Sequence, residues 1–443
     1  MRLIARMRRS RIGRHRRAIA WGFVDQACSS ATNFGLSLLA GRLLGPGGLG
    51  RVFLGFSIYL VVVNLQRRLL TEPLLSATSA LDPERRSRTA RSGLAMSLAL
   101  GVLCTAAVVA LALTVLHDFA DRGLLLIAPW LIPAVVQDYW RNVLFREGRA
   151  GAAALNDSVW LAIMLLSLPA VWIWSSDWAV MAWWGGGAVA GASYGLVQTR
   201  VVPTPFGEAW VWFRDVVWPF GKWNAGTGIL IAVGTQLETF AVLGILSAAA
   251  LGGLRAASTV FAPLSLIIPA IALPGLPAIA RAEASGTGRK LAVNLSVVAV
   301  VASGAFALML FVGGWRLLPF LFGHEFTRYR DLIGPVSAAQ VFAAAQVGFV
   351  LLIKARMRGR TLLLIQAVTT GVGLALVVTL SFAYGLTGAA WGGAGANLLS
   401  TVLCLFAIVR QSGEPAHTPA EGVGALPGSP PIVDGLTDRR DEE

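Results

Sequence analysis

Long apolar stretches recur along most of the chain and are separated by short polar segments. The stretch at 94–116, for example, is apolar almost throughout and lacks the alternation expected of a strand in a membrane β-barrel. A helix needs roughly 20 such residues to cross the hydrocarbon core of a bilayer. The sequence therefore predicts about twelve transmembrane helices, at 20–43, 50–72, 92–116, 122–142, 152–175, 178–200, 222–247, 252–280, 291–313, 331–353, 361–383 and 387–409.

Basic residues cluster in every second connection between these helices. If the N-terminus is cytoplasmic, 30 of the 37 Lys and Arg residues fall on the cytoplasmic side, as the positive-inside rule requires. The segment 1–19 is itself rich in arginine, but the stretch after it contains Asp25 and Asn33 and lacks a small-residue cleavage site. We therefore expect a multi-pass protein of the cytoplasmic (inner) membrane, with a retained first helix and both termini in the cytoplasm.

Composition supports this prediction and excludes several other classes of protein. Of the 443 residues, 56% are hydrophobic and only 14% are charged, whereas roughly 25% are charged in a soluble protein. The net charge of +14 comes from the clusters between helices, so we expect no nucleic-acid partner. The three cysteines lie in apolar stretches and the four histidines are scattered, so we expect neither disulfides nor a metal or other cofactor.

The chain divides into two halves of six predicted helices, 20–200 and 222–410. The connector 201–221 carries Trp210, Phe213 and Val217 at helical spacing and is predicted to lie as an amphipathic helix at the cytoplasmic interface. The tail 411–443, rich in Pro, Gly and charge, is predicted to be disordered.

The two halves also contain a weak internal repeat. Residues 34–53 align with 236–255 so that Leu49 and Gly50 correspond to Leu251 and Gly252. Related halves around a central site are typical of transporters. The predicted fold is therefore all-α, with two pseudo-symmetric six-helix lobes around a central cavity.

Four polar residues lie inside predicted helices at corresponding places in the two halves. Asp25 and Gln26 belong to the first helix, and Gln236 and Glu238 to the seventh. Because ionisable groups in a membrane are costly, they face a cavity, a partner or another helix. We interpret them as lining a hydrated, substrate-binding cavity; the alternative is that neighbouring hydroxyl groups satisfy them in a packed bundle.

Four arginines are candidates for binding an anionic substrate. Arg67 and Arg68 are predicted at the inner end of the second helix, and Arg51 and Arg255 near the outer ends of the second and eighth. The planar guanidinium group suits phosphate. The alternatives are that Arg67 and Arg68 only orient their helix, and that Arg51 and Arg255 meet lipid phosphates.

Four other charged residues near the inner helix ends are predicted to form a gate. Asp138 and Arg141 lie three residues apart, a spacing that predicts a pair on one helix face. Asp157 begins the next helix across a short loop, and Glu72 follows Arg68 at the end of the second helix. We assign these residues a structural role in the inner gate.

The predicted eighth helix, 252–280, contains four prolines. Pro269 and Pro274 are its most central prolines, between Pro263 and Pro277. Each proline removes a backbone donor and bends a helix, so we expect this helix to be bent or broken and to act as a hinge.

Nothing in the sequence indicates an enzyme. It contains no nucleophile elbow, zinc-protease motif, P-loop or dinucleotide-binding glycine motif. A membrane glycan-modifying enzyme would need large outer loops that carry acids, and none is predicted.

Several segments together resemble the oligosaccharide flippases of the multidrug/oligosaccharidyl-lipid/polysaccharide (MOP) superfamily, in its polysaccharide biosynthesis branch. The resemblance covers roughly residues 18–410. The segments that carry it are LLGPGGLGRVFLG at 43–55, RRLLTEPLL at 67–75, QDYWRNVLFREGR at 137–149, NDSVW at 156–160, GTQLETFAVLGILSAAALGGLRAA at 234–257, LFGHEF at 321–326 and YGLTGAAWG at 384–392.

The resemblance implies a flippase that moves a polyprenyl-diphosphate-linked oligosaccharide from the inner to the outer leaflet by alternating access. Its partners would be membrane lipid, the lipid-linked glycan, and glycosyltransferases or a polymerase of the same pathway. An ion-coupled multidrug exporter of the same superfamily is the main alternative. Arginines outnumber acids in the candidate cavity, which favours an anionic lipid-linked cargo.

Overall fold

The computed structural model describes residues 2–72, 83–114, 123–313, 316–356 and 358–410. All regular secondary structure within these ranges is helical. The predicted disordered tail, 411–443, lies outside the described residues.

The N-terminal half consists of long helices joined by short connections. Its elements are α1 (Arg2–Gln66), the π-helical turn η1 (Arg67–Thr71), α3 (Pro83–Thr114), α4 (Gly123–Arg146), α5 (Ala150–Trp174) and α6 (Asp177–Thr199). The first of these is two helices, because Gly45 interrupts it with φ 65° and ψ −170°. Glycine adopts this conformation without a steric penalty, so the chain reverses there and then continues as a second membrane helix.

The C-terminal half follows a short linker and also consists of helices joined by short connections. The linker is α7 (Phe206–Trp212) and η2 (Phe213–Val217). The half itself comprises α8 (Trp218–Ile245), α9 (Ala248–Thr259), α10 (Leu264–Ala284), α11 (Gly288–Gly313), α12 (Leu317–Phe322), the 3₁₀ segment η4 (His324–Leu332), α13 (Ile333–Ala345), α14 (Val347–Ala355) and α15 (Gly359–Arg410). The last helix is again two, divided at Gly385 with φ 60°.

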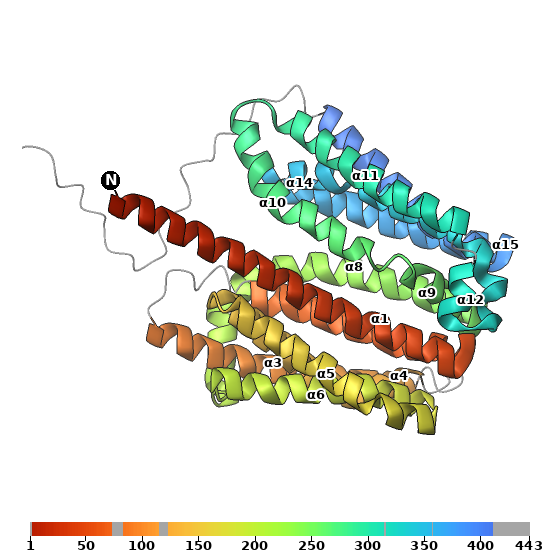
Figure 1. Cartoon of the computed structure of the whole chain (residues 1–443), viewed down its shortest axis with the longest axis horizontal. Helices are drawn as coiled ribbons and strands as arrows, with labels where there is room; N and C mark the ends of the chain where they lie inside the picture. The colour runs from red at the N-terminus through yellow and green to blue at the C-terminus, as the bar shows by residue number, and fades with distance from the viewer. Residues whose placement is uncertain (1, 73–82, 115–122, 314–315, 357, 411–443) are drawn as a thin grey trace, which may run out of the picture.

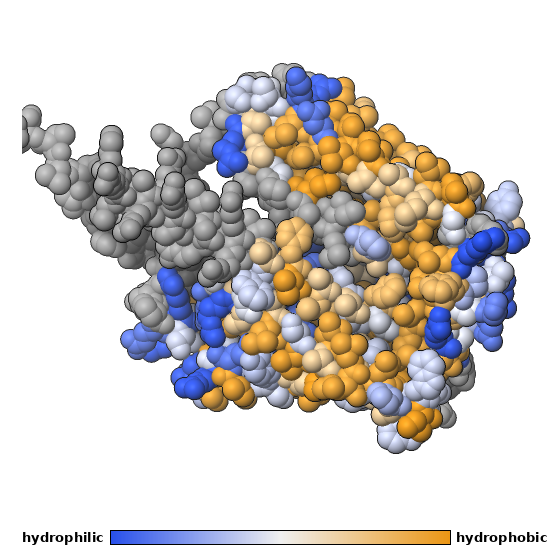
Figure 2. All heavy atoms as spheres, in the orientation of Figure 1, coloured by the Kyte–Doolittle hydropathy of each residue, from blue (hydrophilic) through white to orange (hydrophobic). Residues whose placement is uncertain are grey.

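Eight helical stretches of the described residues are long and apolar enough to cross a membrane, and two of them are 52 residues long. If each of these two counts as a pair, and α6 and α10 are added, the described helices make twelve crossings. Figure 2 shows hydrophobic residues across the middle of one face and hydrophilic residues toward its two ends. The chain is a multi-pass membrane protein, and the predicted number of helices is confirmed.

The crossings form two bundles on either side of α1 (Figure 1). The helices α3, α4, α5 and α6 lie on one side, and α10, α11, α14 and α15 lie on the other. Both halves of the molecule meet where α8 and α9 pack against α1. We call the bundles the N-lobe and the C-lobe.

The predicted eighth helix is broken, but not at its central prolines. The helix α9 ends at Thr259, residues 260–263 form a turn, and α10 begins at Leu264. The backbone is continuously helical through Pro269 and Pro274, and a hinge at these two prolines stays a prediction. The break falls at Pro263, which lies directly before the first residue of α10 and so disrupts no bond inside that helix.

The linker packs its apolar face onto the N-lobe. Ala209, Phe213 and Val217 are buried against Leu70 of η1 and against α3. Trp210, which we predicted on the same face as Phe213 and Val217, has 46% of its surface exposed. Residues four apart share a helix face, whereas Trp210 is rotated by about 100° from Ala209. The tryptophan therefore faces outward.

Candidate functional site

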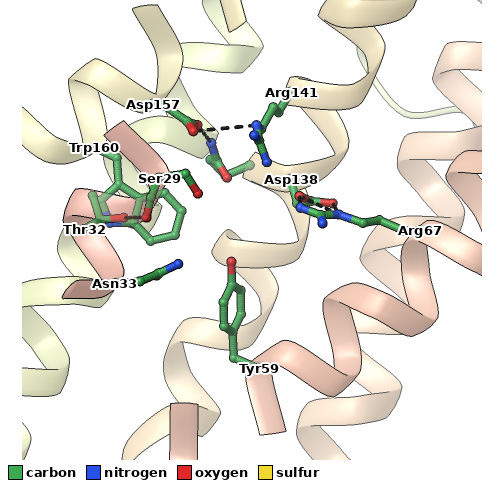
Figure 3. A pocket seen from close by; sticks show the side chains of 10 residues that line it. Ser29, Thr32, Asn33, Tyr59, Arg67, Asp138, Arg141, Asp157 and Trp160 are labelled. Carbon is green, nitrogen blue, oxygen red and sulfur yellow. Dashed lines mark hydrogen bonds and ion pairs between the residues drawn. The ribbon is translucent and has the colours of Figure 1, made fainter. Parts of the chain in front are cut away.

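Five charged residues meet inside the N-lobe. They are Asp25 of α1, Arg67 of η1, Asp138 and Arg141 of α4, and Asp157 of α5, which we call the N-lobe charged cluster. Arg67, Asp138, Arg141 and Asp157 line a small cavity (Figure 3), and Asp25 joins the cluster through its bond to Arg141. The cavity has room for about one water molecule, with a volume of about 20 Å³. Its other lining residues are Ser29, Thr32, Asn33, Tyr59, Gln137 and Trp160.

Arg67 is bound to Asp138. Its Nε lies 3.1 Å from Oδ1 and 3.0 Å from Oδ2 of that carboxylate, and its Nη2 donates a further bond to Oδ1. Asn142 donates to the same group, with 3.1 Å between Nδ2 and Oδ2. A guanidinium–carboxylate contact through several N–H groups is among the stronger hydrogen-bonded pairs in proteins. In this structure Arg67 is therefore not available to a phosphate.

Arg141 bonds two other acids. Its Nε lies 2.8 Å from Asp25 Oδ2 and 3.6 Å from Asp157 Oδ2. The predicted pairing of Asp138 with Arg141 is therefore wrong. The spacing does place both on one face of α4, but α1 and η1 bring Asp25 and Arg67 against that face. Asp138 and Arg141 are thus each paired with a charge from another helix.

The cluster contains three carboxylates and two guanidinium groups. Gln137 adds an amide that lies 2.6 Å from Asp157 Oδ1 and 3.0 Å from Asn156 Oδ1. Among the described residues, the buried Oδ1 of Asp25 has no hydrogen-bond partner. Gln137 and Tyr59 were not among the site residues predicted from the sequence. The hydroxyl group of Tyr59 points toward the cavity in Figure 3. Gln137 lies directly before Asp138, and two adjacent polar residues inside a predicted membrane helix were the signal that could have identified Gln137 as a site residue.

A second, larger cavity lies in the C-lobe next to the lobe junction. Its volume is about 240 Å³, and Glu238 of α8 and Arg255 of α9 are the charged residues among its lining side chains. The Nε of Arg255 lies 3.1 Å from Ser37 Oγ of α1. Its guanidinium carbon lies 4.6 Å from the ring centre of Phe53 and 5.6 Å from that of Phe56. Arg255 therefore bridges the lobes through a hydroxyl and two aromatic faces. Within the described ranges, no carboxylate lies at ion-pair distance from it.

The remaining candidates are spread over the lobe junction and the helix ends. Gln236 joins α8 to α1: Ser57 Oγ donates to Gln236 Oε1 at 3.0 Å, and Gln236 Nε2 donates to the Ser57 carbonyl at 3.2 Å. Arg68 packs against α8, since a Cβ atom added to Gly228 would lie 2.2 Å from its Cδ. Gln26 lies beside Asp25 and is 3.5 Å from Arg141 Nη2.

Arg51 and Glu72 lie outside both cavities. Arg51 forms an ion pair with Asp177, with 3.3 Å between Nη2 and Oδ1, so it does not share a site with Arg255. Glu72 is exposed and follows the last residue of η1.

The lobes are in backbone contact at the end that contains Gly45. A Cβ atom added to Gly50 would lie 1.8 Å from the Ala248 carbonyl oxygen, and one added to Gly252 would lie 1.9 Å from the Pro46 carbonyl oxygen. These glycines are the corresponding positions of the internal repeat. The repeat thus places two close-approach glycines opposite each other across the lobe junction.

The segment α12–η4 also spans the junction at this end. Phe322 packs against Gly41 of α1, where an added Cβ atom would lie 2.4 Å from its ring. Arg42 donates to the carbonyl oxygens of Phe320 and Leu321, which lie in the last turn of α12 and cannot be bonded within it. The Gly45 end of the molecule is therefore closed by contacts from both lobes.

No family model and no curated protein matches this chain, whereas solved structures do. One match is an inward-facing conformation of a multidrug resistance MATE family transporter of the MOP superfamily. The identity is 14%, the TM-score is 0.69, and the match covers 86% of this chain and 94% of that one. Another is the lipid II flippase MurJ in an inward closed conformation, with 12% identity, a TM-score of 0.70, and 88% and 87% coverage.

An outward-facing conformation of a MATE family transporter of the MOP superfamily matches with a lower TM-score. Its TM-score is 0.61 at 12% identity, and the match covers 88% of this chain and 93% of that one. The chain has the two-lobe, twelve-helix fold of the transporters of the MOP superfamily.

Proposed function

We propose that this protein is an alternating-access transporter that carries a lipid-linked, diphosphate-bearing oligosaccharide from the inner to the outer leaflet of the cytoplasmic membrane. The proposal depends on one observation, the surroundings of Arg255. This guanidinium group lies at the lobe junction, touches both lobes, and has no carboxylate partner among the described residues. A charge at membrane depth without a counter-charge is costly, so the position suits an anion that arrives with the cargo.

The proposal moves the predicted phosphate contact from Arg67 to Arg255. Arg67 and Arg141 are neutralised by three aspartates inside the N-lobe. Arg255 instead contacts Ser37 and the rings of Phe53 and Phe56 in the other lobe, and parting of the lobes would break these contacts. Binding of a diphosphate would thus be coupled to the state of the junction, and transport needs no bond to be made or broken.

The competing proposal is an exporter of cationic drugs. The observation in its favour is the excess of carboxylates in the N-lobe charged cluster, together with Glu238 in the C-lobe cavity. One MATE structure similar to this chain is a multidrug resistance transporter. An exporter of cations would bind its cargo at these acids and would not need Arg255.

The two functions can be separated in a host that lacks its own oligosaccharide flippase. We expect expression of this protein to restore surface glycan and to leave drug susceptibility unchanged. Arg255→Ala should abolish rescue, and Arg255→Lys should rescue partially, because lysine keeps the charge but loses the planar fork of donors. The exposed Arg214→Ala serves as a control and should rescue fully. Drug resistance without glycan rescue, or full rescue by Arg255→Ala at normal abundance, would refute the proposal.

A further inference from the structure

The C-lobe cavity has a lining that mixes donors and acceptors. Besides Glu238 and Arg255 it is lined by Gln340 of α13, Asn397 of α15 and Ser258 of α9, with Thr239 of α8 beside Glu238. These polar side chains come from four helices and are set among apolar ones such as Val242, Leu254 and Val377. Polar groups at membrane depth must find partners, so their convergence on one space calls for a polar occupant.

The hydrogen bonds within the helices determine what these groups offer to a ligand. Ser258 donates its hydroxyl proton to the Leu254 carbonyl at 2.9 Å, and Thr239 donates its own to the Thr235 carbonyl at 2.9 Å. Asn397 uses its amide nitrogen on the Gly393 carbonyl at 3.1 Å. The two hydroxyl oxygens and the amide oxygen thus remain as acceptors, alongside the carboxylate of Glu238. The donors are the guanidinium group of Arg255, the amide of Gln340 and the second N–H of Asn397.

A lining with both donors and acceptors, and with one charge of each sign, does not suit a simple ion. A metal cation would be repelled by Arg255. An anion inside the cavity would be repelled by Glu238, whereas a diphosphate bound to Arg255 at the lobe junction would stay outside the cavity. An apolar chain would leave both charges and both amides without partners. A neutral polyol matches, because each of its hydroxyl groups both donates and accepts.

The size of the cavity narrows the choice further. Sites for drug-sized ligands occupy roughly 300–1,000 Å³, and this cavity of about 240 Å³ is smaller. It suits one sugar ring and not an oligosaccharide. Arg255 lies between the cavity and Ser37 of the N-lobe, so a diphosphate held there would be directly next to it.

We propose that the C-lobe cavity binds the sugar that is attached directly to the diphosphate of the cargo, with Gln340, Asn397 and Glu238 hydrogen-bonding its hydroxyl groups. This assignment rests on the proposed function and deepens it: Arg255 holds the phosphate, and the cavity selects the first sugar. The rest of the glycan and the lipid tail extend out of the cavity.

The test compares two ligands on the purified full-length protein. One is a short-chain prenyl diphosphate that carries a single hexose, and the other is the same prenyl diphosphate without the sugar. We expect the wild-type protein to bind the hexose-bearing lipid about tenfold more tightly, as one or two net hydrogen bonds would produce. In Gln340→Met and in Asn397→Leu, the ratio of the two Kd values should fall to near one.

A matched control makes the same chemical change outside the cavity. Gln366 of α15 donates to Thr370 Oγ1 and does not line the cavity, so Gln366→Met should keep the tenfold ratio. Ser258→Ala removes a single hydroxyl oxygen and provides a milder variant if the larger changes impair folding. It should lower the ratio severalfold.

Different results would contradict the sugar-site proposal and the proposed function. If the wild-type protein binds both lipids equally, or if Gln340→Met, Asn397→Leu and Ser258→Ala all keep the preference, the sugar is not held in this cavity and the flippase proposal stands. If the wild-type protein binds neither lipid, the proposed function itself fails.

Discussion

At the scale of single residues, two arginines of this protein have opposite surroundings. Arg67 is held by Asp138 through three N–H···O contacts, whereas Arg255 contacts Ser37 and two phenylalanine rings. Both were candidates for phosphate binding on the same grounds. The difference follows from which helix lies opposite: α4 presents a carboxylate to Arg67, and α1 presents a hydroxyl to Arg255.

The Arg67–Asp138 pair gives a prediction about stability. Only 3% of the Asp138 side chain is exposed, whereas 37% of the Arg67 side chain is. Asp138→Ala therefore leaves a partly solvated guanidinium group without its counter-charge and should cost about 2 kcal/mol, between the values for buried and exposed pairs. The double variant Arg67→Leu, Asp138→Leu should be clearly more stable than Asp138→Ala, because it leaves no unpaired charge. Thermal unfolding of the purified protein in detergent measures both.

An exposed pair serves as the control for this measurement. Arg214 and Asp215 have 62% and 52% of their side chains exposed, and Asp215→Ala should leave the unfolding temperature nearly unchanged, because water screens an exposed ion pair. If Asp138→Ala were as mild as Asp215→Ala, the N-lobe charged cluster would not be a tightly paired network.

At the scale of elements, the lobes approach each other closely where α1 crosses α9. Gly50 and Gly252 allow the two backbones to touch. Side chains of any size would hold these helices apart, so the absence of a Cβ atom is what permits closure at this end. The contacts of Phe322 with Gly41 and of Arg42 with the end of α12 add to the same closure.

Gly50→Ala should therefore open the Gly45 end. The new Cβ atom would lie 1.8 Å from the Ala248 carbonyl oxygen, and backbone cannot move aside as a flexible side chain can. In a variant without native cysteines, a cysteine at Ser37 should react severalfold faster with a membrane-impermeant thiol reagent added outside. Gly186→Ala is the control, because an added Cβ atom there meets nothing within 4 Å. Equal labelling rates in the two backgrounds would show that this contact does not close the junction.

At the scale of the whole molecule, the two lobes are joined along α1, α8 and α9 and closed at the Gly45 end. The charge distribution predicts that this end faces outward, because the basic clusters lie at the opposite helix ends. A transporter closed on the outside and carrying Arg255 at its junction would be in the state that loads cargo from the cytoplasmic side.

The predicted orientation can be tested with reporter fusions. Reporters placed after residues 118 and 385 should read as outside, and those after residues 150 and 288 as inside. Two or more inverted signals would overturn the predicted topology and, with it, the direction of transport that we propose.

Much of this architecture was encoded locally. The apolar stretches predicted twelve helices, because burying about twenty apolar residues in lipid requires a helix whatever its neighbours are. The internal repeat identified Gly50 and Gly252 as corresponding positions, although not that they touch. The proline content of the predicted eighth helix indicated that this helix would break. It did not indicate which of the four prolines marks the break, which the structure places at Pro263.

The sequence by itself thus determined the membrane-spanning helices and the charged residues that lie within them or at their ends. Only the tertiary structure decided which charges meet. Asp138 and Arg141 share a helix face, yet each is paired with a charge from another helix, because ion pairs depend on distances between helices that no spacing along one helix contains. For the same reason, Arg67 is neutralised inside the N-lobe, and Arg255 lies between the lobes next to a cavity of about 240 Å³.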